Sequence, residues 1–127
     1  MRIKYVHEPQ KKNDYSFNTR YNFLKLEEEY YVFGILVSKS NTLYVVLVDD
    51  SILFVEAKYF SIIDPTLFSP AFFGKHISQN DVYTVFGSEA MATNYDYLAR
   101  LYGKEKTAVE EFKEYTKLCK ESSILIH

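Results

Sequence analysis

Apolar residues dominate the centre of the chain in three consecutive runs. Tyr30–Val37, Leu43–Val48 and Ile52–Ala57 are rich in β-branched and aromatic residues, which favour extended structure. Short polar segments with the composition of turns, Ser38–Asn41 and Asp49–Ser51, separate the runs. Runs joined by such short turns predict an antiparallel β-meander. The second and third runs are almost continuously apolar, so we expect these two strands to be buried on both faces.

The segments that flank this meander have weaker patterns. Residues 2–7 alternate and predict a short first strand, whereas the polar residues 8–13 predict a loop. In residues 14–26 the apolar positions fit both a period of two and one helical face, and we favour a short helix. After the third run, residues 59–63 either extend that strand or follow it, and Asp64-Pro65 ends the sheet.

Two different patterns lie between the sheet and the last third of the chain. Leu67, Phe68, Phe72 and Phe73 form an apolar cluster in a loop-like context, which we expect to fold over the open end of the core. The polar stretch Gly74–Asp81 predicts a surface loop.

The last third of the chain has helical periodicity. Met91, Tyr95, Leu98 and Tyr102 fall on one helical face, and Gly103 follows in the position of a C-terminal cap. Thr107–Glu110 matches a capping box that begins a second helix. One face of this second helix is predicted to be buried; its members are Ala108, Val109, Phe112, Tyr115, Thr116 and Cys119.

Together these elements predict an α+β fold, a central antiparallel β-meander with C-terminal helices packed on it. Ile124–Ile126 is expected to add a final edge strand. The length of 127 residues fits one domain, and we assign residues 1–127 to it.

Composition indicates a cytoplasmic protein. Cys119 is the only cysteine, so no internal disulfide can form. No apolar stretch follows the basic start of the chain, as a secretory signal requires. The longest apolar run, Tyr30–Val37, is far shorter than a membrane-spanning helix. We therefore expect no membrane partner.

Charge is uneven along the chain, although the net charge is only −2. Residues 27–81 carry eight acidic and three basic residues, so the middle of the chain is acidic. An acidic surface repels nucleic acid and attracts a basic partner. Tyr44 and Phe54 lie on predicted strands but in these acidic surroundings, so we expect a core role for them rather than an RNA-binding platform.

The residue types that carry catalysis or bind metals do not form a recognisable group. His7, His76 and His127 lie in three separate segments, and we expect them to be solvated loop and terminal residues. Cys119 lies near a helix C-terminus, where the helix dipole disfavours a thiolate, so we expect it in the core. The four glycines do not form a phosphate-binding loop. We therefore predict no metal, no cofactor and no enzymatic activity.

Two acidic clusters remain as candidate sites. Glu27, Glu28 and Glu29 precede the first long strand, and Asp49 and Asp50 lie in a turn, with Glu56 on the next strand. Paired carboxylates can serve acid–base chemistry in a pocket that raises one pKa, but at a hairpin tip they more often form the turn itself. Both clusters are also suited to recognising a basic partner.

The chain resembles the bacterial immunity proteins that neutralise toxins of contact-dependent growth inhibition and related polymorphic toxin systems. The resemblance rests on a short, Tyr- and Phe-rich chain without catalytic motifs, and on three segments: Leu43–Asp50, Phe60–Phe68 and Val109–Tyr115. It implies a one-to-one complex with a cognate protein toxin, possible targets being nucleases with basic surfaces. Under this hypothesis the partner-binding residues are Glu27, Glu28, Glu29, Asp49 and Asp50, with nearby tyrosines. The toxin could also add a strand to an exposed sheet edge.

Two alternatives stay open at this point. An aromatic-lined cavity could bind a small molecule or serve a small enzyme, with Phe68, Phe72, Phe73 and Tyr83 as its lining. A structural or phage-derived adaptor is the third class, and self-association through Ile124–Ile126 would support it.

Overall fold

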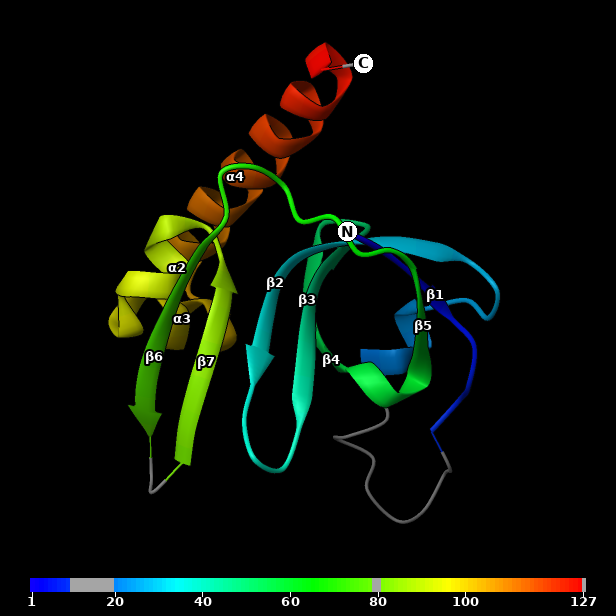
Figure 1. The fold of residues 1–127 in the computed structure, drawn as a ribbon, viewed down its shortest axis with the longest axis horizontal. Coiled ribbons are helices and arrows are strands. Elements are labelled where there is room, and N and C mark those ends of the chain that lie inside the picture. The colour runs from blue at the N-terminus through cyan, green and yellow to red at the C-terminus, as the bar shows by residue number, and fades with distance from the viewer. Residues whose placement is uncertain (10–19, 79–80, 127) are drawn as a thin grey trace.

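The computed structural model describes residues 1–9, 20–78 and 81–126 (Figure 1). Its strands form one antiparallel sheet of seven strands. Three of them are the predicted meander: β2 (Glu29–Val37), β3 (Thr42–Val48) and β4 (Ser51–Glu56). Asn41 closes the turn between β2 and β3, because its carbonyl accepts a hydrogen bond from the Ser38 amide at 2.8 Å.

The sheet divides at β2, whose two halves have different neighbours along one edge. The first half pairs with β1 (Arg2–Tyr5), with Ile3 opposite Tyr30, and the second half pairs with β7 (Asp81–Gly87), with Ile35 opposite Phe86. The sheet therefore has two branches: β1 followed by β5 (Phe60–Asp64), and β7 followed by β6 (Phe72–Ser78). Figure 1 shows the two branches on opposite sides of β2.

An irregularity in β2 lies at the point where the sheet divides. Val32 pairs with Val46 and Gly34 with Val45, so Phe33 is an extra residue opposite β3. Such a bulge bends a strand and changes which side chains face which layer. A side chain at position 34 would also displace the end of the Met91 side chain, so glycine leaves room for Met91 to pack here.

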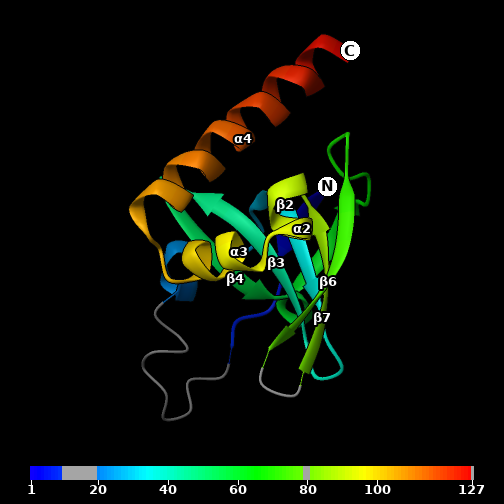
Figure 2. The ribbon, with the colours of Figure 1, turned by 90° about the vertical axis from the view of Figure 1, so that its left-hand side faces the viewer.

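Among the described residues, three α-helices cover one face of the sheet (Figure 2). They are α2 (Glu89–Thr93), α3 (Tyr95–Tyr102) and α4 (Lys106–Ile126). The core between helices and sheet includes Phe33, Val45, Met91, Leu101 and Phe112. The predicted fold class, an antiparallel meander with C-terminal helices packed on it, is confirmed.

The first predicted helix is interrupted. Asn94 ends α2 and begins α3, where its Oδ1 accepts a hydrogen bond from the Tyr97 amide at 3.1 Å. This break rotates the buried face, so that Tyr97, Leu98 and Leu101 are buried. Tyr95 and Tyr102, which we predicted on one helical face with Met91 and Leu98, are exposed.

A second core lies on the other face of the sheet. β1, β5 and two short 3-10 helices, η1 (Arg20–Phe23) and η2 (Ala57–Tyr59), cover it. Neighbouring residues of β3 therefore enter different cores: Val45 packs toward the helices and Val46 away from them, and both are fully buried. The prediction that the second and third strands are buried on both faces is confirmed.

The prediction of a surface loop over Gly74–Asp81 is wrong, because most of this segment belongs to the β6–β7 hairpin. Phe72 and Phe73 also lie in β6 rather than in a loop over the core. Main-chain pairing along the whole hairpin outweighs the polar composition of the segment. Gly74 allows α2 to approach β6, since a side chain at this position would collide with the Ala92 carbonyl.

The ends of α4 also differ from the prediction. Its first turn is capped by Glu105 and not by Thr107, because the Glu105 carboxylate accepts from the amides of Thr107 and Ala108 at 3.2 and 3.3 Å. Ile124–Ile126 continues the helix instead of forming an edge strand. Four residues of the predicted buried face of α4 are buried, namely Ala108, Phe112, Thr116 and Cys119, and Val109 and Tyr115 are partly buried.

The N-terminal prediction is tested only in part. β1 confirms the first strand. The short helix favoured within residues 14–26 is limited to η1 among the described residues, and residues 10–19 lie outside them.

Candidate functional site

The five acidic residues proposed to bind a partner lie on two turns at one end of the sheet. Glu27 and Glu28 precede β2 and Glu29 is its first residue, whereas Asp49 and Asp50 form the β3–β4 turn. β2 and β3 are antiparallel, so the start of β2 lies beside the end of β3. All five residues are exposed. We call this group of five the acidic end.

Tyr30 connects the two clusters of the acidic end. Its hydroxyl accepts a hydrogen bond from the Lys25 amide at 2.8 Å and lies 3.5 Å from Glu28 Oε2, to which it can donate. Burial raises the pKa of the Tyr30 phenol, and the negative charges of Glu28 and Asp49 raise it further. The phenol therefore stays neutral and presents a polar group beside the Glu28 carboxylate.

Basic residues neutralise part of the acidic end. Arg2 lies 3.0 Å from Glu29, Lys4 lies 4.0 Å from Glu27, and Lys113 of α4 lies 3.9 Å from Asp50. Among the described residues, Glu28 and Asp49 form no ion pair. Exposed pairs of this kind are weak, so a basic partner could replace them.

Three residues of the acidic end have an unusual backbone. Glu27, Asp49 and Asp50 have φ angles of 69°, 46° and 68°. Val48 pairs with Ser51, so Asp49 and Asp50 are the two central residues of a tight hairpin. Two consecutive positive φ angles define the type I′ turn, in which short polar residues are preferred. These aspartates therefore have a role in the fold besides any role in binding.

The histidines and the cysteine are positioned by packing. His76 was expected in a solvated loop, but it is buried in β6, where its Nε2 lies 3.0 Å from the Met91 carbonyl oxygen. His7 is exposed, as expected, and His127 lies outside the described residues. Cys119 is buried, as predicted, and burial raises the pKa of its thiol. The described residues contain no group of three or more side chains able to hold a metal ion.

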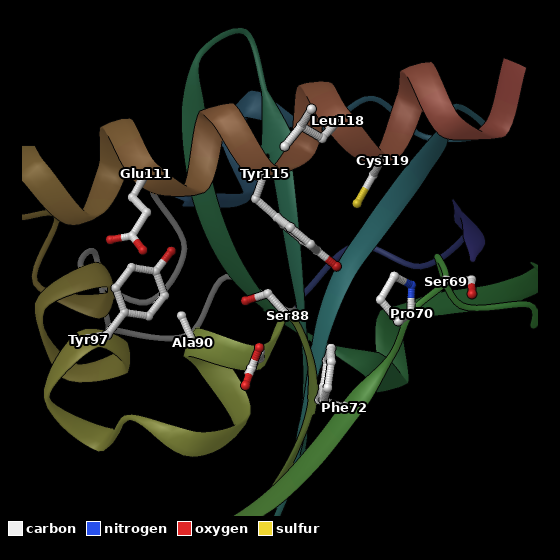
Figure 3. Close-up of a pocket in the computed structure, with 11 residues that line it drawn as sticks. Ser69, Pro70, Phe72, Ser88, Ala90, Tyr97, Glu111, Tyr115, Leu118 and Cys119 are labelled. Carbon is white, nitrogen blue, oxygen red and sulfur yellow. The ribbon is translucent and has the colours of Figure 1, made fainter. Parts of the chain in front are cut away.

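A groove of about 450 Å³ separates α4 from α2 and from the segment that leads into β6 (Figure 3). We call it the helix groove. Phe72, Ala90 and Leu118 give it apolar walls, while Glu89 and Glu111 add carboxylates. Its other lining residues are Ser69, Pro70, Ser88, Tyr97, Tyr115 and Cys119.

A second groove of about 350 Å³ lies between the sheet and α3. Leu36, Phe54 and Leu98 form part of its apolar surface. The polar groups along it are His76, Tyr83, Tyr95 and Tyr102, so we call it the aromatic groove.

The predicted cavity lining is therefore only partly correct. Phe72 lines the helix groove and Tyr83 the aromatic groove. Phe68 instead stacks on Phe33 at 5.3 Å between ring centres, and Phe73 is 71% exposed on the outer face of the sheet.

The outer face of the β6–β7 hairpin is an apolar surface that the sequence prediction missed. Phe73 opposes Phe86 and Ile77 opposes Val82, and these pairs share the face that points away from the helices. Phe73 and Ile77 are 71% and 76% exposed. We call this surface the hairpin face; it consists of Ile35, Val37, Phe73, Lys75, Ile77, Val82, Thr84 and Phe86.

One sequence signal could have revealed this hairpin. Val82–Phe86 is rich in β-branched and aromatic residues, and Gln79-Asn80 before it is a polar pair suited to a turn. In residues 73–77, Phe73, Lys75 and Ile77 alternate with Gly74 and His76. This segment contains too many polar residues to predict a strand unless the pairing with Val82–Phe86 is known.

Comparison of the chain with known protein families, with curated proteins and with solved structures finds no match. Within residues 1–9, 20–78 and 81–126, no helix combines the length and the apolar character needed to cross a membrane.

Proposed function

We propose that this chain acts by binding another protein, and that the hairpin face is the main contact. The observation that carries the proposal is the exposure of Phe73 and Ile77, which stand beside Phe86 and Val82 on neighbouring strands. Contiguous exposed apolar side chains of this kind mark interaction surfaces.

The edge of β6 adds a second means of attachment. Within the described part of the chain, β6 pairs only with β7, so the main-chain groups of its other edge are available to a partner strand. Two copies paired antiparallel about Lys75 would place two ammonium groups opposite each other, so this register of self-pairing is unfavourable. We propose a different protein as the partner.

The finer proposal concerns the identity of that partner. We propose a cognate bacterial toxin domain, neutralised by this chain as an immunity protein. The resemblance to immunity proteins and the acidic end support this proposal. Glu28 and Asp49 would attract a basic toxin surface, such as that of a nuclease, and would guide it during association.

A co-expression experiment tests both levels. The tagged chain is used as bait, and the products of neighbouring reading frames are expressed with it. We expect one stoichiometric partner that stops growth when expressed alone and is harmless with this chain. If no protein is recovered, the proposal of a protein partner fails; if the partner is not toxic, the immunity role alone fails.

Matched substitutions then test the hairpin face. Ile77→Ser removes a 76% exposed side chain from this face, and Ile62→Ser removes a 51% exposed side chain from β5 in the other branch. Burial of an isoleucine in an interface contributes about 2 kcal/mol, so Ile77→Ser should weaken binding at least roughly tenfold. Ile62→Ser should leave the affinity unchanged. Equal affinities of the two variants would exclude the hairpin face.

A second candidate function is the binding of a small apolar molecule in the aromatic groove. The favouring observation is the convergence of Tyr83, Tyr95, Tyr102 and His76 on an apolar surface. Native mass spectrometry of the protein purified from its source cell tests it. A bound molecule that Leu98→Trp displaces would support this function, whereas a mass equal to that of the bare chain would contradict it.

A further inference from the structure

The helix groove combines an apolar floor with negative charge on its rim. In Figure 3, Glu111 and Tyr115 extend from α4 into the groove, and Tyr97 rises toward Glu111 from α3. Among the described residues, Glu111 forms no ion pair. Arg100, whose guanidinium lies 6.0 Å from the centre of the Tyr97 ring, is bound to Asp96 and Glu105 at 3.0 and 2.9 Å. The charge of Glu111 is therefore available to a ligand.

Tyr97 provides a second polar group in the groove. The residue as a whole is only 2% exposed, and its hydroxyl makes no hydrogen bond within the described part of the chain. This oxygen is not among the fully buried polar atoms without a partner, so it is accessible to a ligand in the groove that Tyr97 lines. Figure 3 shows that this hydroxyl points toward the Glu111 carboxylate. Burial, followed by the Glu111 charge, raises the pKa of Tyr97 to about 12, so the phenol is neutral and its oxygen can accept.

The other wall of the groove is suited to an apolar chain. Phe72, Ala90 and Leu118 contribute carbon surface, and Leu118 is 54% exposed although it lies on the groove side of α4. Tyr115 is neutral, because burial raises its pKa well above the usual range and Cys119 raises it further. No cationic side chain is among the described residues that line the groove.

We propose that the helix groove binds an organic cation, an ammonium or guanidinium group carried on a short apolar chain. Glu111 is its counter-ion, the Tyr97 hydroxyl oxygen accepts one of its hydrogens, and Phe72 and Leu118 contact the chain. A cation is the ligand that satisfies both groups at once, since it donates to a carboxylate and to a phenol oxygen. This site is separate from the hairpin face and does not depend on the proposed function.

Titration of the full chain with n-butylguanidinium, followed by amide chemical shifts in NMR, tests the site. We expect shifts at Ser88, Ala90 and the turn of α4 that carries Glu111 and Tyr115. Neutral n-butylurea has nearly the same shape and should bind much more weakly. Glu111→Gln should weaken n-butylguanidinium binding about fivefold, as expected for one partly exposed ion pair. Glu110→Gln changes the next residue, which does not line the groove, and should have no effect.

Tyr97→Phe separates the ligand role from a structural one. The substitution keeps the buried ring and removes only the hydroxyl without a partner, so it should not lower stability but should weaken binding. The proposal is overturned if n-butylurea binds as tightly as n-butylguanidinium. It is also overturned if Glu111→Gln leaves the affinity for n-butylguanidinium unchanged, or if the chemical shifts change elsewhere on the chain.

A parallel titration with N-acetyl-arginine amide identifies the source of the cation. Binding of this compound indicates an arginine side chain of a protein, and its exclusion indicates a free small molecule.

Discussion

The turn between β3 and β4 contains two residues that have a role in the fold and that we also propose for recognition. Asp49 and Asp50 both have positive φ angles, which non-glycine residues adopt at a cost in free energy. Asn-Gly is the preferred pair in such a type I′ turn. The two carboxylates are also adjacent like charges. The turn would therefore be more stable with other residues, which is consistent with a role for these charges in binding.

We predict that Asp49→Asn combined with Asp50→Gly raises the free energy of unfolding by about 1 kcal/mol, because it relieves the strain of the left-handed backbone. The midpoint of urea denaturation measures this change. Lys39→Gly, in the β2–β3 turn at a residue without positive φ, is the control and should give no stabilisation. A lower midpoint for the double variant would show that the turn does not have this geometry.

The same double variant tests the acidic end in binding. It removes two carboxylates while it keeps the turn, so a loss of affinity cannot be attributed to misfolding. If the acidic end attracts a basic partner, the association rate should fall and depend less on salt concentration. An unchanged rate with unchanged salt dependence would remove Asp49 and Asp50 from the interface.

At the scale of elements, the start of α4 depends on one side chain. Glu105 accepts from the Thr107 hydroxyl at 2.7 Å, from Arg100 at 2.9 Å, and from two amides of the first helical turn. These donors, the Thr107 hydroxyl first and Arg100 second, lower the pKa of Glu105 from 4.5 to about 2. Glu105 thus joins α3 to α4 through Arg100. It also accepts hydrogen bonds from amides of the first turn of α4, which have no acceptor within the helix.

This shift of pKa predicts a dependence of stability on pH. Because the pKa is lower in the folded state, the stabilisation by Glu105 is complete above 4.5 and is lost as the pH falls toward about 2. Glu105→Gln should therefore have a lower Tm than the unchanged protein at neutral pH, and the two should converge across this acidic range. Glu110→Gln, on the exposed side of α4, should leave Tm unchanged at every pH. A constant difference between Glu105→Gln and the unchanged protein would contradict this account.

At the scale of the whole molecule, the sheet separates two cores. The helices cover one core, and β1, β5, η1 and η2 cover the other. β3 contributes to both, because its successive side chains point to opposite faces. The two cores therefore share one framework, and damage to either should destabilise the other.

We predict that Val45→Ala and Val46→Ala each lower the free energy of unfolding by about 2 kcal/mol, since each removes two buried methyl groups and leaves a cavity. Both side chains are 0% exposed. Val82→Ala, at a 48% exposed position of β7, should cost less than about 0.5 kcal/mol. Urea denaturation followed by far-UV circular dichroism gives all three values. A single transition in each variant is expected, and a separate early transition for one variant would show that the cores unfold independently.

The sequence by itself determined the elements that local patterns encode. The meander follows from β-branched and aromatic runs, and the buried face of α4 follows from helical spacing, because both periodicities depend on neighbours along the chain. Burial of β3 and β4 on both faces could be predicted from their continuous apolar composition. The acidic residues could be identified as exposed turns, since charged groups at strand ends are rarely buried.

Only the tertiary structure decided which distant segments meet. β6 is too polar to be recognised as a strand until β7 supplies its hydrogen bonds, and the hairpin face exists only through that pairing. The two acidic clusters meet because β2 and β3 are antiparallel, and His76 is buried because α2 provides the Met91 carbonyl. The helix groove joins residues from β6, α3 and α4. Contacts between segments far apart in sequence depend on the packing of both partners, and the periodicity of one segment does not contain that information.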